Sequence, residues 1–365
     1  MAERSWNVRV PTVPGSDLIV PSPHGPPPPG SRTVRTDDGV DLHVEVDEGA
    51  AGDGPAPLTV VLSHGFTARL AEWELQRPVL RDRARLVLWD QRGHGRSSWA
   101  DPRSATIDRT GRDLAAVLDA TTPEGPIVLA GHSMGGMSIM ALARQRPELF
   151  GPRVVGVFLL ATSDGGLVES GLVGRAVKLV RMLGLLPLYL WLLRWSAPLF
   201  ERLRRRGTRA GRWFTRRYLF GRHDAEPALV RLVQDLLEET PFPIAAAFYA
   251  TFLDHDESAS LDVLARVPVT VVAAEEDRLT PAAHGRRMAQ RIGRSAELVV
   301  VPGAGHSVNL TRSEIVDQAL LRLLDRVEAP HQDLGAPVEN GYLPVHDRRA
   351  LLRRARQARR PPDDV

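Results

Sequence analysis

A serine lies between two glycines where an apolar run gives way to a helical pattern. The stretch VLAGHSMGGMSIMALA covers residues 128–143, and Ser133 stands between Gly131 and Gly135 in its G-x-S-x-G centre. A chain that turns sharply from strand into helix leaves one residue strained, and its neighbours two positions away must be small. Such a turn would expose the Ser133 hydroxyl at a helix N-terminus, where backbone N–H groups favour negative charge. Ser133 is therefore a candidate nucleophile, although this motif alone also fits a helix-capping serine in a Gly-rich turn.

A histidine that could activate this serine follows late in the chain. His306 stands in GAGHSVNL, and the flanking Gly303 and Gly305 would let the loop bring its imidazole over Ser133. Asp277 precedes it by 29 residues (306 − 277), which leaves room for one helix and one strand between them. Serine, aspartate and histidine together carry out nucleophilic acyl transfer.

Short apolar runs alternate with helical stretches through most of the chain, which is typical of a parallel sheet covered by helices. Six runs are candidate buried strands: 59–65, 85–91, 126–133, 154–163, 269–277 and 297–306. Before them, SRTVRTDDGVDLHVEVDEG (31–49) alternates on both sides of Asp38-Gly39, which predicts an antiparallel hairpin at the sheet edge.

In these motifs and their order the chain resembles the α/β-hydrolase fold family, in its serine hydrolase branch of esterase-like and lipase-like enzymes. The resemblance covers about residues 32–163 and 260–328. It implies an α/β fold, with a mostly parallel eight-stranded sheet flanked by helices and an inserted helical cap. Serine at the turn separates the chain from the dehalogenase and epoxide hydrolase branches, which use aspartate there.

The resemblance also implies which groups would hold an oxyanion. By the match of SHGF (63–66), one donor is the backbone N–H of Phe66, and the residue after the nucleophile, Met134, supplies the other. In DQRGHGRSS (90–98), Gly93 and Gly95 would shape a loop beside the site. His94 in that loop is assigned a structural role, because the general base belongs after the last strand.

For the acid, the family's pattern of an aspartate shortly before a proline selects Asp277 over the adjacent Glu275 and Glu276. Asp164 is the alternative acid, since some family members carry it after the sixth strand. Asp277 would orient His306 and stabilise its cation.

The chain outside the two core segments divides into three predicted parts. Residues 1–31 form a mobile Pro-rich arm, 164–259 a helical cap or lid, and 329–365 a basic, Pro-containing tail; residues 32–163 and 260–328 make up the hydrolase core. The arm has no continuous apolar stretch of the kind that a secretory signal needs, so a cytoplasmic protein is expected.

Composition excludes several other classes of site. The sequence has no cysteine, which excludes disulfides and thiolate chemistry, and shows no spacing for metal ligands, so neither metal nor organic cofactor is expected. Lys178 is the single lysine against 46 arginines (47 − 1), a bias of the kind that genome composition produces. A nucleic-acid partner is therefore not expected.

The predicted cap or lid, residues 164–259, gives information on the class of substrate. LVRMLGLLPLYLWLLRWSAPLF (179–200) is apolar on nearly every side, and it is either a buried cap helix or a lid or tunnel for an acyl chain, with Leu186, Leu190 and Trp191 as pocket residues. Its prolines and its internal arginine argue against a membrane span. The basic run at 202–217 suits peripheral contact with anionic headgroups.

These features together predict a serine hydrolase that cleaves carboxylic esters, preferably lipid-like ones such as monoacylglycerols or lysophospholipids. Two alternatives stay open at this level. The same triad supports acyl transfer or C–C bond hydrolysis, and a hydrolase-like chain can serve as a non-catalytic, membrane-associated binding module.

Overall fold

A computed structural model describes ten stretches of the chain: 8–12, 16–20, 26–49, 58–99, 101–167, 179–189, 191–192, 195–196, 209–222 and 227–329. Within the predicted N-terminal arm it contains a two-stranded antiparallel hairpin, β1 (Val8–Thr12) and β2 (Ser16–Val20). This pairing was not predicted from the sequence, because prolines exclude a helix but leave extended chain possible. The predicted tail from residue 330 onward lies outside the described residues.

Eight strands form the main sheet, in the order β10, β9, β8, β7, β5, β6, β4, β3. Strands β5 to β10 run parallel to one another, whereas β3 and β4 are antiparallel at one edge. This arrangement confirms the predicted fold class, the six predicted strands and the edge hairpin. The strands are β3 (Ser31–Arg35), β4 (Asp41–Asp47), β5 (Thr59–Ser63), β6 (Arg85–Trp89), β7 (Ile127–His132), β8 (Val154–Leu160), β9 (Val269–Ala274) and β10 (Ala296–Val301).

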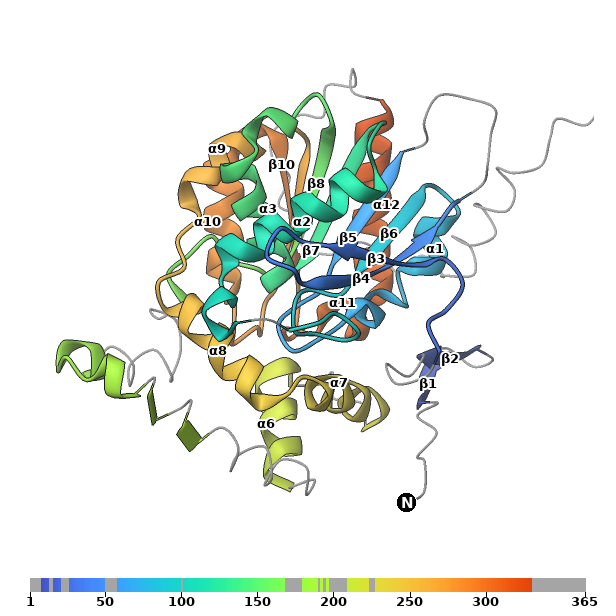
Figure 1. Ribbon diagram of the computed structural model, residues 1–365. Coiled ribbons are helices and arrows are strands. Elements are labelled where there is room, and N and C mark those ends of the chain that lie inside the picture. Colours follow the sequence, from blue (N-terminus) through green and yellow to red (C-terminus); the bar gives the residue numbers. More distant parts are fainter. Residues whose placement is uncertain are drawn as a thin grey trace, which may run out of the picture.

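Helices cover both faces of the sheet (Figure 1). One apolar core joins the sheet to α2 (Ile107–Thr121), α3 (Met134–Gln145), α9 (Leu261–Leu264) and α10 (Ala282–Ile292). The other joins it to η1 (Leu70–Trp73), α1 (Arg77–Arg81), α11 (Val308–Thr311) and α12 (Ser313–Glu328). Strands buried on both faces need near-continuous apolar sequence, which explains why the six runs were recognisable.

Between β8 and β9 the described chain contains helices and no strand of the sheet. Helical turns occur at 179–182 and 186–189, followed by α6 (Arg209–Leu219), α7 (Pro227–Glu239) and α8 (Phe242–Leu253). A third apolar cluster attaches α6 and α7 to η1 and to Leu310 of α11. These helices therefore pack next to loops that carry site residues. None of the helices in the described stretches is long and apolar enough to cross a bilayer.

Candidate active site

The turn from β7 into α3 has the strained geometry that the sequence predicts. Ser133 adopts φ 51° and ψ −116°, a conformation that costs a non-glycine residue free energy, and α3 begins at the next residue. A Cβ added to Gly131 would lie 2.5 Å from the Gly135 carbonyl carbon, and one added to Gly135 would lie 2.2 Å from the Ser63 carbonyl oxygen. Only glycine fits at either position, because backbones cross there directly.

Ser133 is less exposed than predicted. The sequence suggested an open hydroxyl at the sheet edge, yet the residue is 9% exposed. Neighbouring loops close around it: the Thr162 hydroxyl donates to the Ser133 carbonyl at 2.6 Å, and His306 covers its hydroxyl. The turn still places Ser133 at the N-terminus of α3, so the predicted electrostatic setting is present.

Three predicted residues form one hydrogen-bonded chain. The Nε2 atom of His306 lies 3.0 Å from the Ser133 Oγ, and its Nδ1 lies 2.7 Å from the Asp277 Oδ2. An acceptor carboxylate at Nδ1 places the ring proton there, which leaves Nε2 free to accept the serine proton. The chain thus has the geometry of a nucleophile, a base and an orienting acid.

The Asp277 carboxylate is held in its ionised form. Its Oδ1 accepts the backbone N–H groups of Leu279 and Thr280, and its Oδ2 accepts the Thr280 hydroxyl at 2.8 Å. Burial raises the pKa of Asp277, but the charge and hydrogen bond of His306, with the Thr280 hydrogen bonds, outweigh burial and leave that pKa below its ordinary value. This role of Thr280 was not predicted, because the amino-acid sequence does not show which way its hydroxyl points.

The other candidate acids lie elsewhere. Asp164 forms an ion pair with Arg287 on α10. Glu275 accepts the backbone N–H of Gly303 at 2.9 Å, and Glu276 accepts that of Arg222 at 2.7 Å. Among these carboxylates, the described contacts bring Asp277 alone to His306.

Of the residues predicted as oxyanion donors, Met134 follows the serine directly and Phe66 belongs to the loop beside it. Met134 is the first residue of α3, so its N–H is among the free amides of that helix end. The loop with Gly65 and Phe66 lies against the turn, since a Cβ added to Gly65 would lie 3.4 Å from the Ser133 Cβ. His64 anchors this loop: it accepts the Gln91 backbone N–H at its Nε2 (2.9 Å) and therefore donates from its Nδ1 to the Gly65 carbonyl (2.7 Å).

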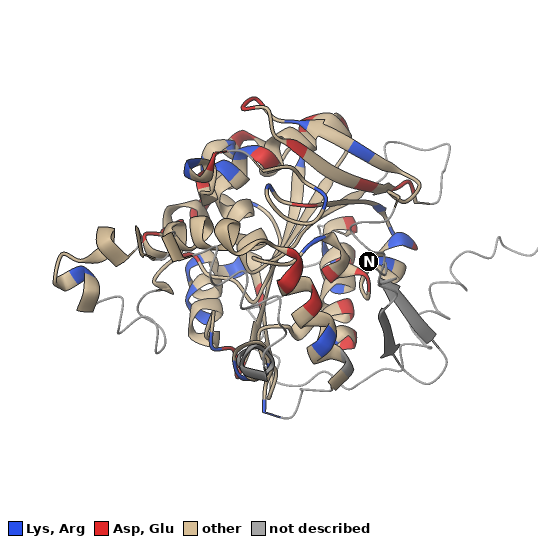
Figure 2. Ribbon diagram, turned by 60° about the horizontal axis from the view of Figure 1, so that its bottom comes forward, with Lys and Arg blue, Asp and Glu red and all other residues tan. Residues whose placement is uncertain are grey.

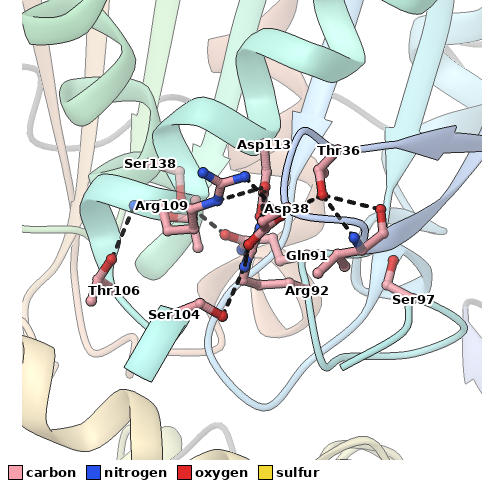
Figure 3. Close-up of polar contacts among 12 residues, drawn as sticks. Thr36, Asp38, Gln91, Arg92, Ser97, Ser104, Thr106, Arg109, Asp113 and Ser138 are labelled. Carbon is pink, nitrogen blue, oxygen red and sulfur yellow. Dashed lines mark hydrogen bonds and ion pairs between the residues drawn. The ribbon is translucent and has the colours of Figure 1, made fainter. Parts of the chain in front are cut away.

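A buried polar network holds the loop after β6 in place (Figure 3). The Arg92 guanidinium donates to Asp113 on α2 with two contacts of 2.6 Å and to Asp38 of the edge hairpin. Gln91 bonds the His64 carbonyl at 2.6 Å and accepts the Ser138 hydroxyl of α3 at 2.9 Å. The network thereby joins the edge hairpin, α2 and α3 to the loop that carries Phe66.

His94 belongs to this framework and not to the hydrogen-bonded chain of Ser133. Its ring is buried, with Nδ1 donating to the Arg92 carbonyl at 2.9 Å. Burial, with a smaller contribution from His64, lowers the pKa of His94 to about 3, so the ring is neutral at physiological pH. The structural role predicted for it agrees with these contacts.

The helical section contacts the site through aromatic residues that sequence reasoning did not single out. Phe252 on α8 packs edge-on against Phe66 with ring centroids 5.1 Å apart, and Phe248 lies 6.3 Å from Phe66. Of the predicted pocket residues, Leu186 is half-buried and Trp191 is 58% exposed, whereas Leu190 lies outside the described residues. Their pocket role stays a prediction.

Comparison with known proteins identifies the family. Residues 60–319 match the alpha/beta hydrolase family. The chain belongs to this family. Over the part of the chain that the structure describes, no cluster of three histidine or acidic side chains could hold a metal ion.

Individual relatives agree with the family assignment. The chain is 28% identical to the dihydrolipoyllysine-residue acetyltransferase component of the acetoin cleaving system of Pseudomonas putida, over 75% of this chain, and it spans only 64% of that relative's length. It is 29% identical to the putative carbamate hydrolase RutD of Caulobacter sp., covering 78% of this chain and 95% of the relative. Among solved structures it is similar to an esterase from Thermogutta terrifontis, with a TM-score of 0.61, 25% identity and coverage of 81% and 98%.

Proposed function

We propose that this protein is a serine hydrolase that cleaves carboxylic esters through an acyl-enzyme on Ser133. The observation that carries the proposal is the continuous chain from the Ser133 Oγ through His306 to Asp277, with links of 3.0 and 2.7 Å, at a strained turn on a helix N-terminus. The similarity to a solved esterase and to a putative carbamate hydrolase supports acyl chemistry at a carbonyl carbon.

The geometry leads to a two-stage reaction. The His306 Nε2 takes the Ser133 proton as the Oγ attacks the ester carbonyl carbon, and the backbone N–H groups of Phe66 and Met134 hold the resulting oxyanion. His306 then gives its proton to the departing alkoxide, which leaves the acyl group on the serine oxygen. A water molecule, deprotonated by His306, attacks the acyl carbonyl, and His306 returns that proton to the Ser133 Oγ as the carboxylic acid is released.

The preferred substrates in this proposal are lipid-like esters, such as monoacylglycerols or lysophospholipids. Exposed apolar side chains in the segment 179–196 support this preference, since a contiguous apolar surface is typical of an interaction site. They are Leu179, Met182, Leu183, Leu185, Leu188, Trp191, Leu192 and Trp195. Figure 2 shows this segment almost free of charge, with Arg181 as its one charged residue among those described.

Peripheral membrane contact is part of the same proposal. A cleft of about 620 Å³ beside α6 is lined by Arg216, Arg217, Arg222 and Arg278 together with Trp213 and Phe220. Guanidinium groups beside aromatic rings suit an anionic headgroup at a bilayer surface. The Ser307 N–H donates to the Leu219 carbonyl at 2.9 Å, so this cleft lies next to the His306 loop.

The test combines labelling with a substrate series. A fluorophosphonate should label the wild-type protein at Ser133, as located by peptide mapping, and block its turnover. Rates on p-nitrophenyl esters of rising acyl length, on a monoacylglycerol and on a lysophospholipid should then show a preference for long chains. Absence of labelling would contradict the serine hydrolase, and a tenfold preference for acetate over octanoate would contradict the lipid-like substrate alone.

A further inference from the structure

A buried ion pair that the proposed reaction does not use lies beside the triad. The His132 Nδ1 is 2.8 Å from the Glu72 Oε1, and both side chains are less than one-tenth exposed. The rings of His132 and His306 lie 4.8 Å apart between centroids. Neither residue stood out in the sequence, because His132 fills a variable position of G-x-S-x-G and Glu72 sits in the apolar run LAEW.

Each partner of this pair holds a different part of the site. The Glu72 Oε2 accepts the Gly65 backbone N–H at 2.8 Å, directly before the proposed oxyanion donor Phe66. On the other side, the His132 Nε2 lies 3.1 Å from the carbonyl oxygen of His306. The pair therefore links the oxyanion loop to the backbone of the proposed general base.

The contacts also determine the protonation state of His132. The His132 Nε2 faces a carbonyl oxygen, which can only accept a hydrogen bond, and its Nδ1 lies at ion-pair distance from a carboxylate oxygen, which repels a bare ring nitrogen and attracts a protonated one. Only the imidazolium carries a proton on both nitrogens. Burial lowers the pKa of His132, but the Glu72 charge and its hydrogen bond, with smaller contributions from the His306 carbonyl and Asp277, raise that pKa above its ordinary value. The titratable groups that face the ring are Glu72 from η1, His64 after β5, Asp277 after β9 and His306 after β10.

We propose that Glu72 and a cationic His132 are positioning residues that hold the oxyanion loop and the His306 loop together, and that loss of the His132 proton sets an alkaline limit to turnover. A neutral ring has one N–H, so it can donate to Glu72 or to the His306 carbonyl but not to both. The lost link leaves a buried acceptor unsatisfied and frees one loop to shift, which weakens transition-state alignment. This inference rests on the proposed serine hydrolase function.

Glu72→Gln is the decisive variant, because it can keep every contact without a charge. The carboxamide oxygen can still accept the Gly65 N–H, while its NH₂ group donates to the Nδ1 of a neutral His132 that donates from Nε2 to His306. We expect kcat near neutral pH to change by less than about threefold and the alkaline decline of kcat to disappear. Glu72→Ala, which removes the acceptor for Gly65, should instead lower kcat by about tenfold to a hundredfold with a smaller change in KM.

The matched control is Glu257→Gln, a buried glutamate paired with Arg144, which should leave the alkaline limb as in the wild type. Profiles of kcat against pH from about 6 to 10 on a short p-nitrophenyl ester decide between outcomes. The inference would be overturned if the wild-type protein showed no alkaline decline of kcat, or if Glu72→Gln kept that decline. The proposed function would still stand in either case, provided that the protein was active and labelled at Ser133. An unlabelled, inactive wild type would overturn the proposed function instead.

Should Glu72→Gln fail to fold, the wild-type protein still provides a test. NMR of ¹⁵N-histidine-labelled protein, assigned with His132→Gln, should show both ring nitrogens of His132 protonated at pH 7. A neutral His132 at that pH would contradict the inference.

Discussion

The edge of the sheet at the carboxyl ends of the parallel strands buries polar side chains, whereas the helical segment at 179–196 exposes apolar ones. At the sheet edge, Ser133, Asp277 and His306 are each less than one-tenth exposed, and their polar atoms have partners. In the helical segment, apolar side chains face outward: Met182 is 77% exposed and Trp195 is 69% exposed. Both views of the chain place this segment apart from the layers that cover the sheet (Figures 1 and 2).

The difference shows what each region is built for. Burial strengthens every hydrogen bond among the polar groups at the sheet edge, so their geometry is rigid and suits chemistry. Exposed apolar area in the helical segment costs free energy in water. This free energy is regained when another surface or a ligand covers the segment. A substitution at the sheet edge should therefore affect all substrates, and one in the helical segment only those that reach it.

The largest effect is expected from Ser133→Ala. Turnover should fall by at least about a thousandfold on every ester, because the hydroxyl that lies 3.0 Å from the His306 Nε2 is removed. Labelling should vanish, and the melting temperature should stay unchanged, because one oxygen is removed. Ser163→Ala is the matched control, since Ser163 is a buried serine 2.6 Å from the Nδ1 of His284 and should keep labelling. A Ser133→Ala protein with a tenth of wild-type turnover would disprove the nucleophile assignment.

Asp277→Asn should come next in size. An amide at this position would favour the wrong His306 tautomer and lower kcat by a few orders of magnitude on long and short esters alike, up to about ten thousandfold. Asp164→Asn should change kcat by less than about tenfold, since Asp164 pairs with Arg287. The reverse ranking in steady-state kinetics would move the acid to the end of β8.

A smaller and substrate-dependent effect is expected from replacing Trp191 and Trp195 with serine. Their rings stack 6.2 Å apart and are largely exposed, so stability should hardly change. Because each buried methylene contributes up to about 0.8 kcal/mol, octanoate hydrolysis should fall about tenfold and acetate hydrolysis less than about twofold. Equal losses on both esters, or a lower melting temperature, would show that these rings form the segment's own core.

The smallest effect is expected from Arg216→Gln combined with Arg217→Gln. If the arginine-lined cleft contacts headgroups, binding to vesicles that contain an anionic phospholipid should weaken by about fivefold per arginine, on the scale of about 1 kcal/mol each. Turnover of acetate esters should stay unchanged. Arg146→Gln with Arg291→Gln removes the same charge at two partly exposed residues that do not line the cleft, and this pair should not weaken binding. Equal loss in both double variants would leave only a net-charge effect.

Much of this protein could be predicted from its sequence because the relevant signals are local. Runs such as 59–65 and 126–133 must be apolar throughout, since parallel strands are buried on both faces. Gly131 and Gly135 indicate the turn around Ser133, because no larger residue fits where the backbones cross. The order of Ser133, Asp277 and His306 along the chain was equally visible.

Other features were decided only by the tertiary structure, because they depend on contacts between residues far apart in sequence. The choice of Asp277 over Asp164 depends on which carboxylate meets the His306 Nδ1 and which meets Arg287. The burial of Ser133 and the roles of Glu72 and Thr280 likewise depend on how loops from separate strands close over one sheet edge. Periodicity reports which face of an element is buried, but it carries no information about which polar atom will find which partner once the chain has folded.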